Sequence, residues 1–429
     1  METTANARSL ALHAQEVPAA PTRAPAKGHR NGVSTGVSTG ASAAGSRAAR
    51  PLDVAIAGTR GVPACYSGFE TFAEELGVRL AARGHRVTVY GRAGYVGPER
   101  RTHRGVDVVP VTAPRGKYLE TPLHTLGAAL LALRARHDVV LLCNAANAFT
   151  IPLFRLPGAR VAINVDGLDR TRRKWGRLGR AWHALGERLS LRLADRPLVD
   201  AQCLAAYYVA RYGRALPVIP YGGERHPDLA IPDPGALSRL GLTPGRYVLV
   251  VGRLEPENNA LLAVRAVEHL RADVPLVIVG DAPYADDYKA LLRRAAGPRV
   301  VFAGGVYGGG YVALQQGAAC YVAAGEVGGT HPALVEAMTF GGPIVANDVP
   351  EHREVLGDAG LYYRPDDAPG LAAAVDRVLG DAPLAAQLVA SARARAAARY
   401  RWDEVVARYE ALFEELVGAR RARRSRSDP

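Results

Sequence analysis

The chain has 429 residues, 48% of them hydrophobic and 22% charged, which is typical of a globular protein with sizeable cores and excludes a largely unstructured chain. This length favours two domains over one. The net charge is +13, no apolar run approaches the roughly 20 residues that span a bilayer, and no secretory signal is visible at the N-terminus. The four cysteines lie far apart in sequence and form no CxxC or Cys/His cluster, so we expect reduced thiols in a cytosolic protein.

Residues 1–50 are rich in Ala, Gly, Ser, Thr and Pro and contain a small repeat, GVSTGVSTGAS, so we predict a disordered tail. Ordered structure is predicted to begin with a buried strand at 53–57. A glycine-containing loop at 58–68, a helix at 69–83 and a strand at 86–90 follow, which is the opening unit of a doubly wound fold. The glycines lack the G-x-G-x-x-G spacing and no acidic residue ends the second strand, so a dinucleotide site is disfavoured.

Strands and helices continue to alternate along the chain, which predicts an α/β protein with two doubly wound, Rossmann-like domains. We place the first domain at 51–220 and the second at 221–400, with a hinge within 218–224. An amphipathic helix follows at 401–417, and the arginine-rich segment 418–429 is predicted to be a disordered basic tail. The further strands are predicted at 107–111, 139–143, 161–165, 247–252, 276–279, 300–302 and 343–346, and the further helices at 123–136, 333–340, 371–379, 385–400 and 402–417.

Asp166 directly follows the predicted strand at 161–165. Because loops at the carboxyl ends of parallel strands form the sites of such folds, Asp166 is a candidate cleft residue; a helix N-cap is the alternative. The next residues combine cations with an aromatic ring, which suits a phosphorylated partner, a lipid headgroup or an anionic membrane surface. A solvated helix start is the alternative for any one of these arginines. The cluster consists of Arg170, Arg172, Arg173, Lys174 and Trp175.

A second candidate site is the glycine-rich loop 325–330. Pro332 follows it at the place where a proline best opens a helix, and Gly341 ends that helix. Such a loop presents free backbone N–H groups and the positive end of a helix dipole, which suits a phosphate group. Glu336 lies one turn into the helix, where it can accept hydrogen bonds from sugar hydroxyls. An ordinary loop with a surface glutamate is the alternative, and a lone histidine such as His331 is more often structural.

These motifs together resemble the group 1 glycosyltransferases, a retaining family with the GT-B fold of two facing Rossmann-like domains. The first half is similar to the bacterial rhamnosyltransferases of capsule and exopolysaccharide assembly, and the likeness covers about residues 52–417. In the second half it is carried by Gly252-Arg253, Pro256-Glu257, Gly329-Thr330, Glu336 to Met338, Gly341 to Pro343 and Asp348. In the first half it is carried by Gly58 to Pro63, Tyr66, Gly68 to Glu75, Asp166-Gly167, Lys174-Trp175 and Ile219 to Gly222. Tyr400, Trp402 and Tyr409 match the terminal helix that crosses back to the first domain in such enzymes.

The resemblance implies transfer of a sugar, with rhamnose from dTDP-rhamnose expected, to a polyprenyl-diphosphate-linked or other glycan acceptor. It implies a peripheral position on the anionic cytoplasmic face of the plasma membrane. Arg253 would face the donor diphosphate, Glu336 would bind the ribose hydroxyls, and Gly68 would let the first domain approach the phosphates. The other expected donor contacts are Asn258, Glu326 and the backbone of Gly328, Gly329 and Thr330. The expected catalytic residues are Asp166, Arg253 and Glu336, and the expected acceptor or membrane contacts are Arg172, Arg173, Lys174 and Trp175.

Three positions depart from the family pattern. The family usually spaces its two glutamates eight residues apart, whereas Glu326 and Glu336 are ten apart. The usual lysine five residues after the arginine is Asn258, which leaves one cation fewer for the diphosphate. The histidine that many relatives carry after the fifth strand of the first domain is Asp166. The last two changes suggest that this subgroup handles charge differently or that its activity is weak.

The predicted mechanism uses no metal and no other cofactor, because no DxD motif stands at a strand end; Asp286-Asp287 and Asp366-Asp367 are adjacent pairs predicted in loops. Charge on the leaving diphosphate would be stabilised by arginine and helix dipoles, and Asp166 would orient the acceptor or act as a base. A nucleotide-sugar epimerase, a phosphorylase or a non-catalytic sugar-nucleotide-binding protein of the same fold are the alternatives. A nucleic-acid partner is not expected, since the basic residues are dispersed and no known binding module is visible.

Overall fold

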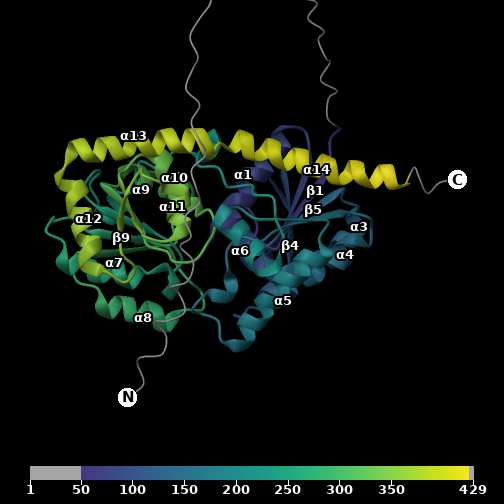
Figure 1. Cartoon of the computed structure of the whole chain (residues 1–429), viewed down its shortest axis with the longest axis horizontal. Helices are drawn as coiled ribbons and strands as arrows, with labels where there is room; N and C mark the ends of the chain where they lie inside the picture. Colours follow the sequence, from purple (N-terminus) through teal and green to yellow (C-terminus); the bar gives the residue numbers. More distant parts are fainter. Residues whose placement is uncertain (1–49, 425–429) are drawn as a thin grey trace, which may run out of the picture. The chain divides into compact units, whose positions relative to one another are not determined.

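The computed structural model describes residues 50–424. Apart from Arg50, the predicted disordered tail at 1–50 lies outside the described residues, as does the end of the predicted basic tail, 425–429. The described residues belong to one unit that contains two sheets, each flanked by helices (Figure 1).

The first sheet has seven strands in the order β3-β4-β2-β1-β5-β6-β7. All neighbours are parallel except β3, which is antiparallel to β4. Alternate residues of β1 belong to different cores, Val54 and Ile56 to one and Ala55 and Ala57 to the other, because successive side chains point to opposite faces. Burial on both faces explains why these strands are continuous apolar runs.

The strands are β1 (Asp53–Ala57), β2 (Arg86–Arg92), β3 (Arg101–His103), β4 (Val106–Val111), β5 (Val139–Cys143), β6 (Arg160–Asn164) and β7 (Arg196–Leu198). The helices are α1 (Gly68–Ala82), α2 (Ala93–Val96), α3 (Glu120–Ala135), α4 (Ile151–Arg155), α5 (Arg177–Leu193) and α6 (Gln202–Tyr212).

The second sheet has six parallel strands in the order β10-β9-β8-β11-β12-β13. It too has a core on each face: Val248 and Val250 of the central strand belong to one cluster and Leu249 to the other. The strands are β8 (Val248–Val251), β9 (Leu276–Val279), β10 (Val300–Gly304), β11 (Cys320–Ala323), β12 (Ile344–Asn347) and β13 (Leu361–Tyr363). The helices are α7 (Ala260–Ala266), α8 (Asp286–Ala295), α9 (Gly308–Gly317), α10 (Pro332–Phe340), α11 (Pro350–Leu356), α12 (Ala368–Gly380), α13 (Ala382–Arg399) and α14 (Trp402–Arg424).

The last two helices connect the domains. Figure 1 shows α13 and α14 end to end, α13 beside the second sheet and α14 beside the first. Trp402 and Tyr409 of α14 are buried in the same core as Phe72 of α1, with the rings of Phe72 and Tyr409 5.5 Å apart. The junction between α13 and α14 is hydrogen-bonded to the interdomain linker. Gly223 N donates to Tyr400 O at 2.7 Å, and Trp402 N donates to Glu224 Oε1 at 2.7 Å. The chain therefore crosses back to its first domain.

The structure corrects two predictions about the helices. The last helix does not end at Val417 but continues to Arg424, because the alanines and arginines after Gly418 are strong helix formers and one glycine does not stop them. Asp286 and Asp287 are not in a loop but begin α8, where two carboxylates complement the helix dipole. No helix within residues 50–424 has the length and apolarity needed to cross a membrane.

Candidate functional site

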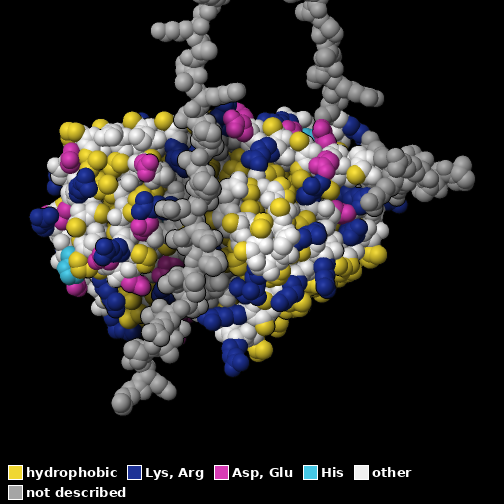
Figure 2. Space-filling model, viewed as in Figure 1, with side chains coloured by type: hydrophobic (Ala, Val, Ile, Leu, Met, Phe, Trp, Pro, Cys, Tyr) yellow, Lys and Arg dark blue, Asp and Glu magenta, His cyan; other side chains and the backbone are white. Residues whose placement is uncertain are grey.

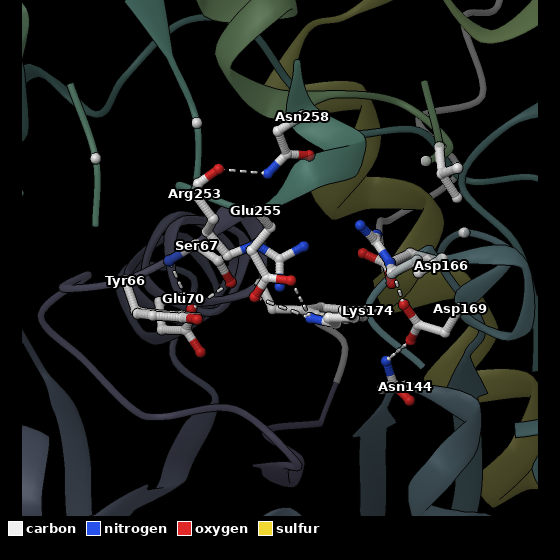
Figure 3. Close-up of a pocket in the computed structure, with 18 of the residues that line it drawn as sticks. Tyr66, Ser67, Glu70, Asn144, Asp166, Asp169, Lys174, Arg253, Glu255 and Asn258 are labelled. Carbon is white, nitrogen blue, oxygen red and sulfur yellow. Dashed lines mark hydrogen bonds and ion pairs between the residues drawn. The ribbon is translucent and has the colours of Figure 1, made fainter. Parts of the chain in front are cut away.

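A cavity of about 1370 Å³ opens between the two domains. Its walls are formed by the loops that follow β1, β6, β8 and β11, which are carboxyl ends of parallel strands in both sheets. Ligands of open α/β sheets bind at this edge, where the loops diverge. Figure 3 shows side chains from both domains converging on this space. The cavity is therefore the candidate site.

Arg253, on the loop after β8, enters the cavity from the second domain (Figure 3). Burial opposes its charge, but Tyr66, Glu255 and Asp169 outweigh this effect and raise its pKa above the ordinary value. Among residues 50–424 no side chain is recorded within hydrogen-bond or ion-pair distance of the Arg253 guanidinium. The side-chain amide of Asn258, by contrast, already has a partner, because its Nδ2 donates to the backbone carbonyl of Arg253 at 2.8 Å. Arg253 thus offers a charged fork of free donors, which suits an anion.

Two helix N-termini meet beside Arg253. Pro332 is the first residue of α10, as predicted, and Gly341 ends this helix in the left-handed region with φ 110°. A Cβ on Gly68, the first residue of α1, would lie 2.7 Å from Pro332 Cγ, so only glycine permits this approach. Since each helix N-terminus carries partial positive charge, their convergence in the cavity favours a phosphorylated ligand.

The glycine-rich loop is also held by the first domain, through a residue that we did not predict. Thr330 N donates to Asp200 Oδ2 at 3.0 Å, and Thr330 Oγ1 donates to Asp200 O. A Cβ on Gly329 would lie 2.0 Å from Asp200 Oδ1, so the glycine leaves room for this carboxylate. The expected phosphate contact at the Thr330 amide is therefore already taken by Asp200. Burial and the nearby Asp166 raise the pKa of Asp200 well above its usual range. Its place directly after β7 was the sequence signal for it.

Glu336 is buried in the cavity wall, 5% exposed. Its carboxylate accepts hydrogen bonds from Tyr311 Oη at 2.6 Å and from Arg225 Nη1 at 3.2 Å. Burial raises its pKa and Arg225 counteracts this effect. Arg225 also pairs with Glu75 of the first domain, at 3.3 Å. Because a carboxylate has about four acceptor sites, Glu336 retains capacity to bind hydroxyl groups of a ligand.

Glu326 does not line the cavity, although its neighbours Gly325 and Val327 do, and its expected contact with the donor stays a prediction. Its carboxylate accepts hydrogen bonds from Asn259 Nδ2 at 2.9 Å and from Arg173 Nη2 at 2.7 Å. Asn259 adopts the left-handed conformation, φ 56°, that aims its amide at this loop. Arg173 is half exposed, lies outside the cavity wall and pairs with Glu326, and its expected acceptor or membrane contact stays a prediction.

Asp166 faces the cavity and does not cap a helix; the short helix Asp169–Thr171 has Leu168 at its N-cap. Tyr221 Oη donates to Asp166 Oδ2 at 3.1 Å. Burial and the neighbouring Asp169 raise the pKa of Asp166 to about 7. Asp169 behaves in the opposite way: despite its burial, the Arg172 guanidinium holds its pKa below the usual range. Two carboxyl groups with separated pKa values in one cleft are characteristic of acid/base sites.

The raised pKa of Asp166 predicts a pH effect on stability. Because the folded state holds this proton more tightly than the unfolded state, its stabilisation is complete at pH below about 4 and is lost as pH rises through 7. Asp166→Asn keeps a neutral side chain at every pH. The melting temperature of the variant is expected to increase relative to that of the wild type as the pH rises from 4 to 8. A difference between the two that stays constant with pH would contradict this assignment.

Arg172 and Lys174 turn inward and line the cavity instead of presenting an outer surface, and their expected contact with an acceptor stays a prediction. Arg172 is 8% exposed and lies between Asp169 and Glu257, with Nη1 3.6 Å from Glu257 Oε1. Lys174 reaches Glu255 of the second domain. Trp175 remains at the cavity mouth, where its ring centre lies 5.9 Å from that of Tyr118.

The mouth of the cavity combines apolar and cationic side chains, most of which we did not predict. The exposed apolar residues come from α3, α5 and the segment before α3, and basic residues lie among them. The apolar residues are Tyr118, Leu119, Leu123, Leu178 and Trp182. Lys117 and Arg177 line the cavity beside them, whereas Arg60 lies over the ring of Tyr66 and Arg92 is buried against Glu120. Within residues 50–424 no group of three or more His, Cys, Asp and Glu side chains is placed to hold a metal ion.

Comparisons with known proteins cover both domains. Residues 67–222 match the family described as glycosyl transferase 4-like domain, and residues 245–381 match the family described as glycosyl transferases group 1. The phosphatidyl-myo-inositol mannosyltransferase of Mycolicibacterium smegmatis is 36% identical over 184 residues, which are 41% of this chain and 46% of that protein. The chain thus spans about half the length of this curated relative.

Solved structures agree with the fold. Sucrose-phosphate synthase from Thermosynechococcus elongatus is 20% identical with a TM-score of 0.71, and covers 85% of this chain and 99% of its own. Anabaena HepE in complex with UDP-glucose is 17% identical with a TM-score of 0.67, and covers 85% and 100%. The α/β GT-B fold and the group 1 likeness are confirmed. The rhamnosyltransferase subgroup stays a prediction, since the curated relative is named as a mannosyltransferase.

Proposed function

We propose that this chain, whose two domains match the two glycosyltransferase families, transfers a sugar from a nucleotide-sugar donor bound between its domains. The observation that carries the proposal is the position of Arg253, charged and free of side-chain partners among the described residues, beside the N-termini of α1 and α10. Diphosphate is the part of a nucleotide sugar that such a cluster of fixed positive charge recognises.

The same residues would act on the transition state. As the sugar leaves, negative charge grows on the nucleoside diphosphate, and preorganised donors in a closed cleft stabilise it without reorganisation. Arg253 and the two helix dipoles supply this stabilisation in our proposal, and no metal is assigned a part. Glu336 would hold the ribose hydroxyls, while Asp166, with its pKa about 7, would orient the acceptor hydroxyl or take its proton. Retention, which the family resemblance implies, then needs no protein nucleophile.

For the transferred sugar we propose rhamnose from dTDP-rhamnose, on the motifs of the first domain. A mannosyl donor is the second candidate, because the relative from Mycolicibacterium smegmatis is named as a mannosyltransferase. Purified protein should be incubated with dTDP-rhamnose, GDP-mannose or UDP-glucose and a lipid extract, and release of each nucleoside diphosphate measured. Release from dTDP-rhamnose alone supports the first candidate, and release from GDP-mannose alone replaces it. Donor binding without any release would indicate the non-catalytic binding protein.

The alternative enzymes have less support. A glycogen-type phosphorylase needs a cofactor lysine in its second domain, and Lys289 lies outside the cavity, paired with Asp281 and Asp286. None of the relatives and solved structures described above is named as an epimerase.

For the acceptor we propose a lipid-linked glycan, presented at the anionic cytoplasmic face of the plasma membrane. The cavity mouth supports this proposal, since Leu178 and Trp182 in the first turns of α5 are exposed. Basic side chains that suit a phosphorylated headgroup line the cavity beside them. In Figure 2 the lower border of the first domain, where Figure 1 places α5, carries Lys and Arg side chains among apolar ones.

Leu178→Glu is expected to weaken cosedimentation with vesicles of anionic phospholipid by several-fold, because Leu178 is 89% exposed and would insert its side chain at the interface. Ile231→Glu is the matched control, since Ile231 is equally aliphatic and 70% exposed but lies in the second domain. Equal loss in both variants, or in neither, would argue against α5 as the membrane contact.

A further inference from the structure

Lys174 crosses the cavity from the first domain to the second. It lies on the loop between β6 and α5, and its Nζ is 3.1 Å from Glu255 Oε1 and 3.0 Å from Glu255 Oε2. The two side chains are 17% and 11% exposed, and both line the cavity. Figure 3 shows this pair next to Arg253, on the side of the cavity where the helix N-termini meet.

Lys174 and Arg253 are two cations that lie beside one shared carboxylate, Glu255. Among the described residues Arg172 has Asp169 and Glu257 as ion-pair partners, whereas Lys174 has Glu255 and no carboxylate lies within ion-pair distance of Arg253. Burial, followed by repulsion from Arg253, lowers the pKa of Lys174 to about 8. Glu255 responds in the opposite direction: burial opposes its charge, yet Lys174 and Arg253 lower its pKa. Arg253 thus repels the charged form of Lys174, and an incoming anion between the two cations would relieve this repulsion.

The second domain has no other free cation for this role among its described cavity residues. Asn258 is neutral and its amide is used on the Arg253 backbone. Arg225 is held by Glu75 and Glu336, and Lys289 lies outside the cavity. A ligand with two adjacent phosphates has enough negative charge to engage a second cation besides Arg253.

We propose that Lys174 is the second cation for the donor diphosphate, and that Glu255 holds it in place while the diphosphate is absent. The inference rests on the proposed function and deepens it. The diphosphate would then bridge the domains, bound by Arg253 from one and by Lys174 from the other. Lys174 belongs with the donor, where the family resemblance had assigned it to the acceptor.

The two partners of this ion pair predict opposite outcomes. Lys174→Met removes a phosphate contact and is expected to raise the Kd for the nucleoside diphosphate by about 10-fold or more, while the Kd for the nucleoside without phosphates stays unchanged. Glu255→Gln removes the competing anion and is expected to leave the diphosphate Kd unchanged or to lower it. Lys289→Met is the matched control, an ion-paired lysine of the second domain outside the cavity.

Titration calorimetry with dTDP, UDP and GDP, each beside its parent nucleoside, measures these changes. If the ion pair serves only to hold the two domains together, Lys174→Met and Glu255→Gln weaken diphosphate binding to the same extent, and the inference is overturned. It is also overturned if Lys174→Met binds diphosphate as the wild type does. If the wild type binds none of the three, the proposed function fails, and the inference fails with it.

The pH dependence gives an independent readout. The charged groups that face Lys174 are Glu255, Arg253, Arg172 and Asp169. Above pH 8 the free protein loses the Lys174 proton, so binding of the diphosphate is expected to weaken between pH 7 and 10. Because the arginine side chain keeps its charge, Lys174→Arg should remove most of this loss. The same alkaline loss in Lys174→Arg as in the wild type would assign it to another group.

Discussion

Arg253→Ala is expected to lower the rate of sugar transfer by about 10²- to 10³-fold, the usual effect of removing one donor that stabilises developing negative charge. Arg253 lies beside two helix N-termini and is free of side-chain partners among the described residues, so its charge is available to the leaving diphosphate. Arg253→Lys keeps the charge but loses the planar fork, and should recover only part of the rate.

Arg271→Ala provides the control, because Arg271 also belongs to the second domain but is 86% exposed and pairs with Asp376 at the surface. We expect wild-type transfer from this variant. The rate should be measured with circular dichroism of the same samples, so that loss of fold is separated from loss of activity. Transfer by Arg253→Ala at the wild-type rate would remove the central residue from the mechanism.

Trp402→Ala is expected to lower the free energy of unfolding by about 3–5 kcal/mol, the typical cost of truncating a large buried aromatic side chain. Trp402 is 3% exposed, its ring stacks at 6.3 Å from that of Phe72, and it fills the space beside Gly222, where a Cβ would meet its indole at 2.3 Å. The substitution therefore opens a cavity at the point where the chain returns to the first domain.

Urea unfolding followed by fluorescence and circular dichroism measures this loss. Trp182→Ala is the comparison, since Trp182 is 39% exposed, and should cost less than the buried tryptophan. If Trp402→Ala unfolds at the same urea concentration as the wild type, the packing of Trp402 of α14 against the first domain does not stabilise the protein as proposed.

Much of the fold could be predicted because local patterns determine it. The strands at 53–57, 139–143 and 276–279 have the predicted bounds, since buried parallel strands are short apolar runs that glycine or charged residues end. The helix opened by Pro332 and ended by Gly341 follows from two residues with defined backbone preferences. Arg253 lies in the cavity wall because the loop after a central strand reaches this edge of the sheet, and its contact with the diphosphate stays a prediction.

The rest depended on contacts between distant segments. Nothing near Glu326 in sequence indicates that Asn259 and Arg173 hold its side chain away from the cavity. Asp200 lies 130 residues from the Thr330 amide that it accepts from, and only the closed pair of domains brings them together. The sequence predicts Lys174 only as an acceptor or membrane contact. Its loop has no periodicity from which the direction of the side chain can be derived.

Equilibrium binding of dTDP, UDP and GDP to the wild-type protein and to Arg253→Ala, each with and without a chelator, tests the central claim most directly. We expect that one nucleoside diphosphate binds the wild type, that chelation leaves its Kd unchanged, and that Arg253→Ala raises this Kd by about 10-fold or more. Absence of binding by all three, or equal binding by the variant, would contradict a donor site built on Arg253 between the two domains.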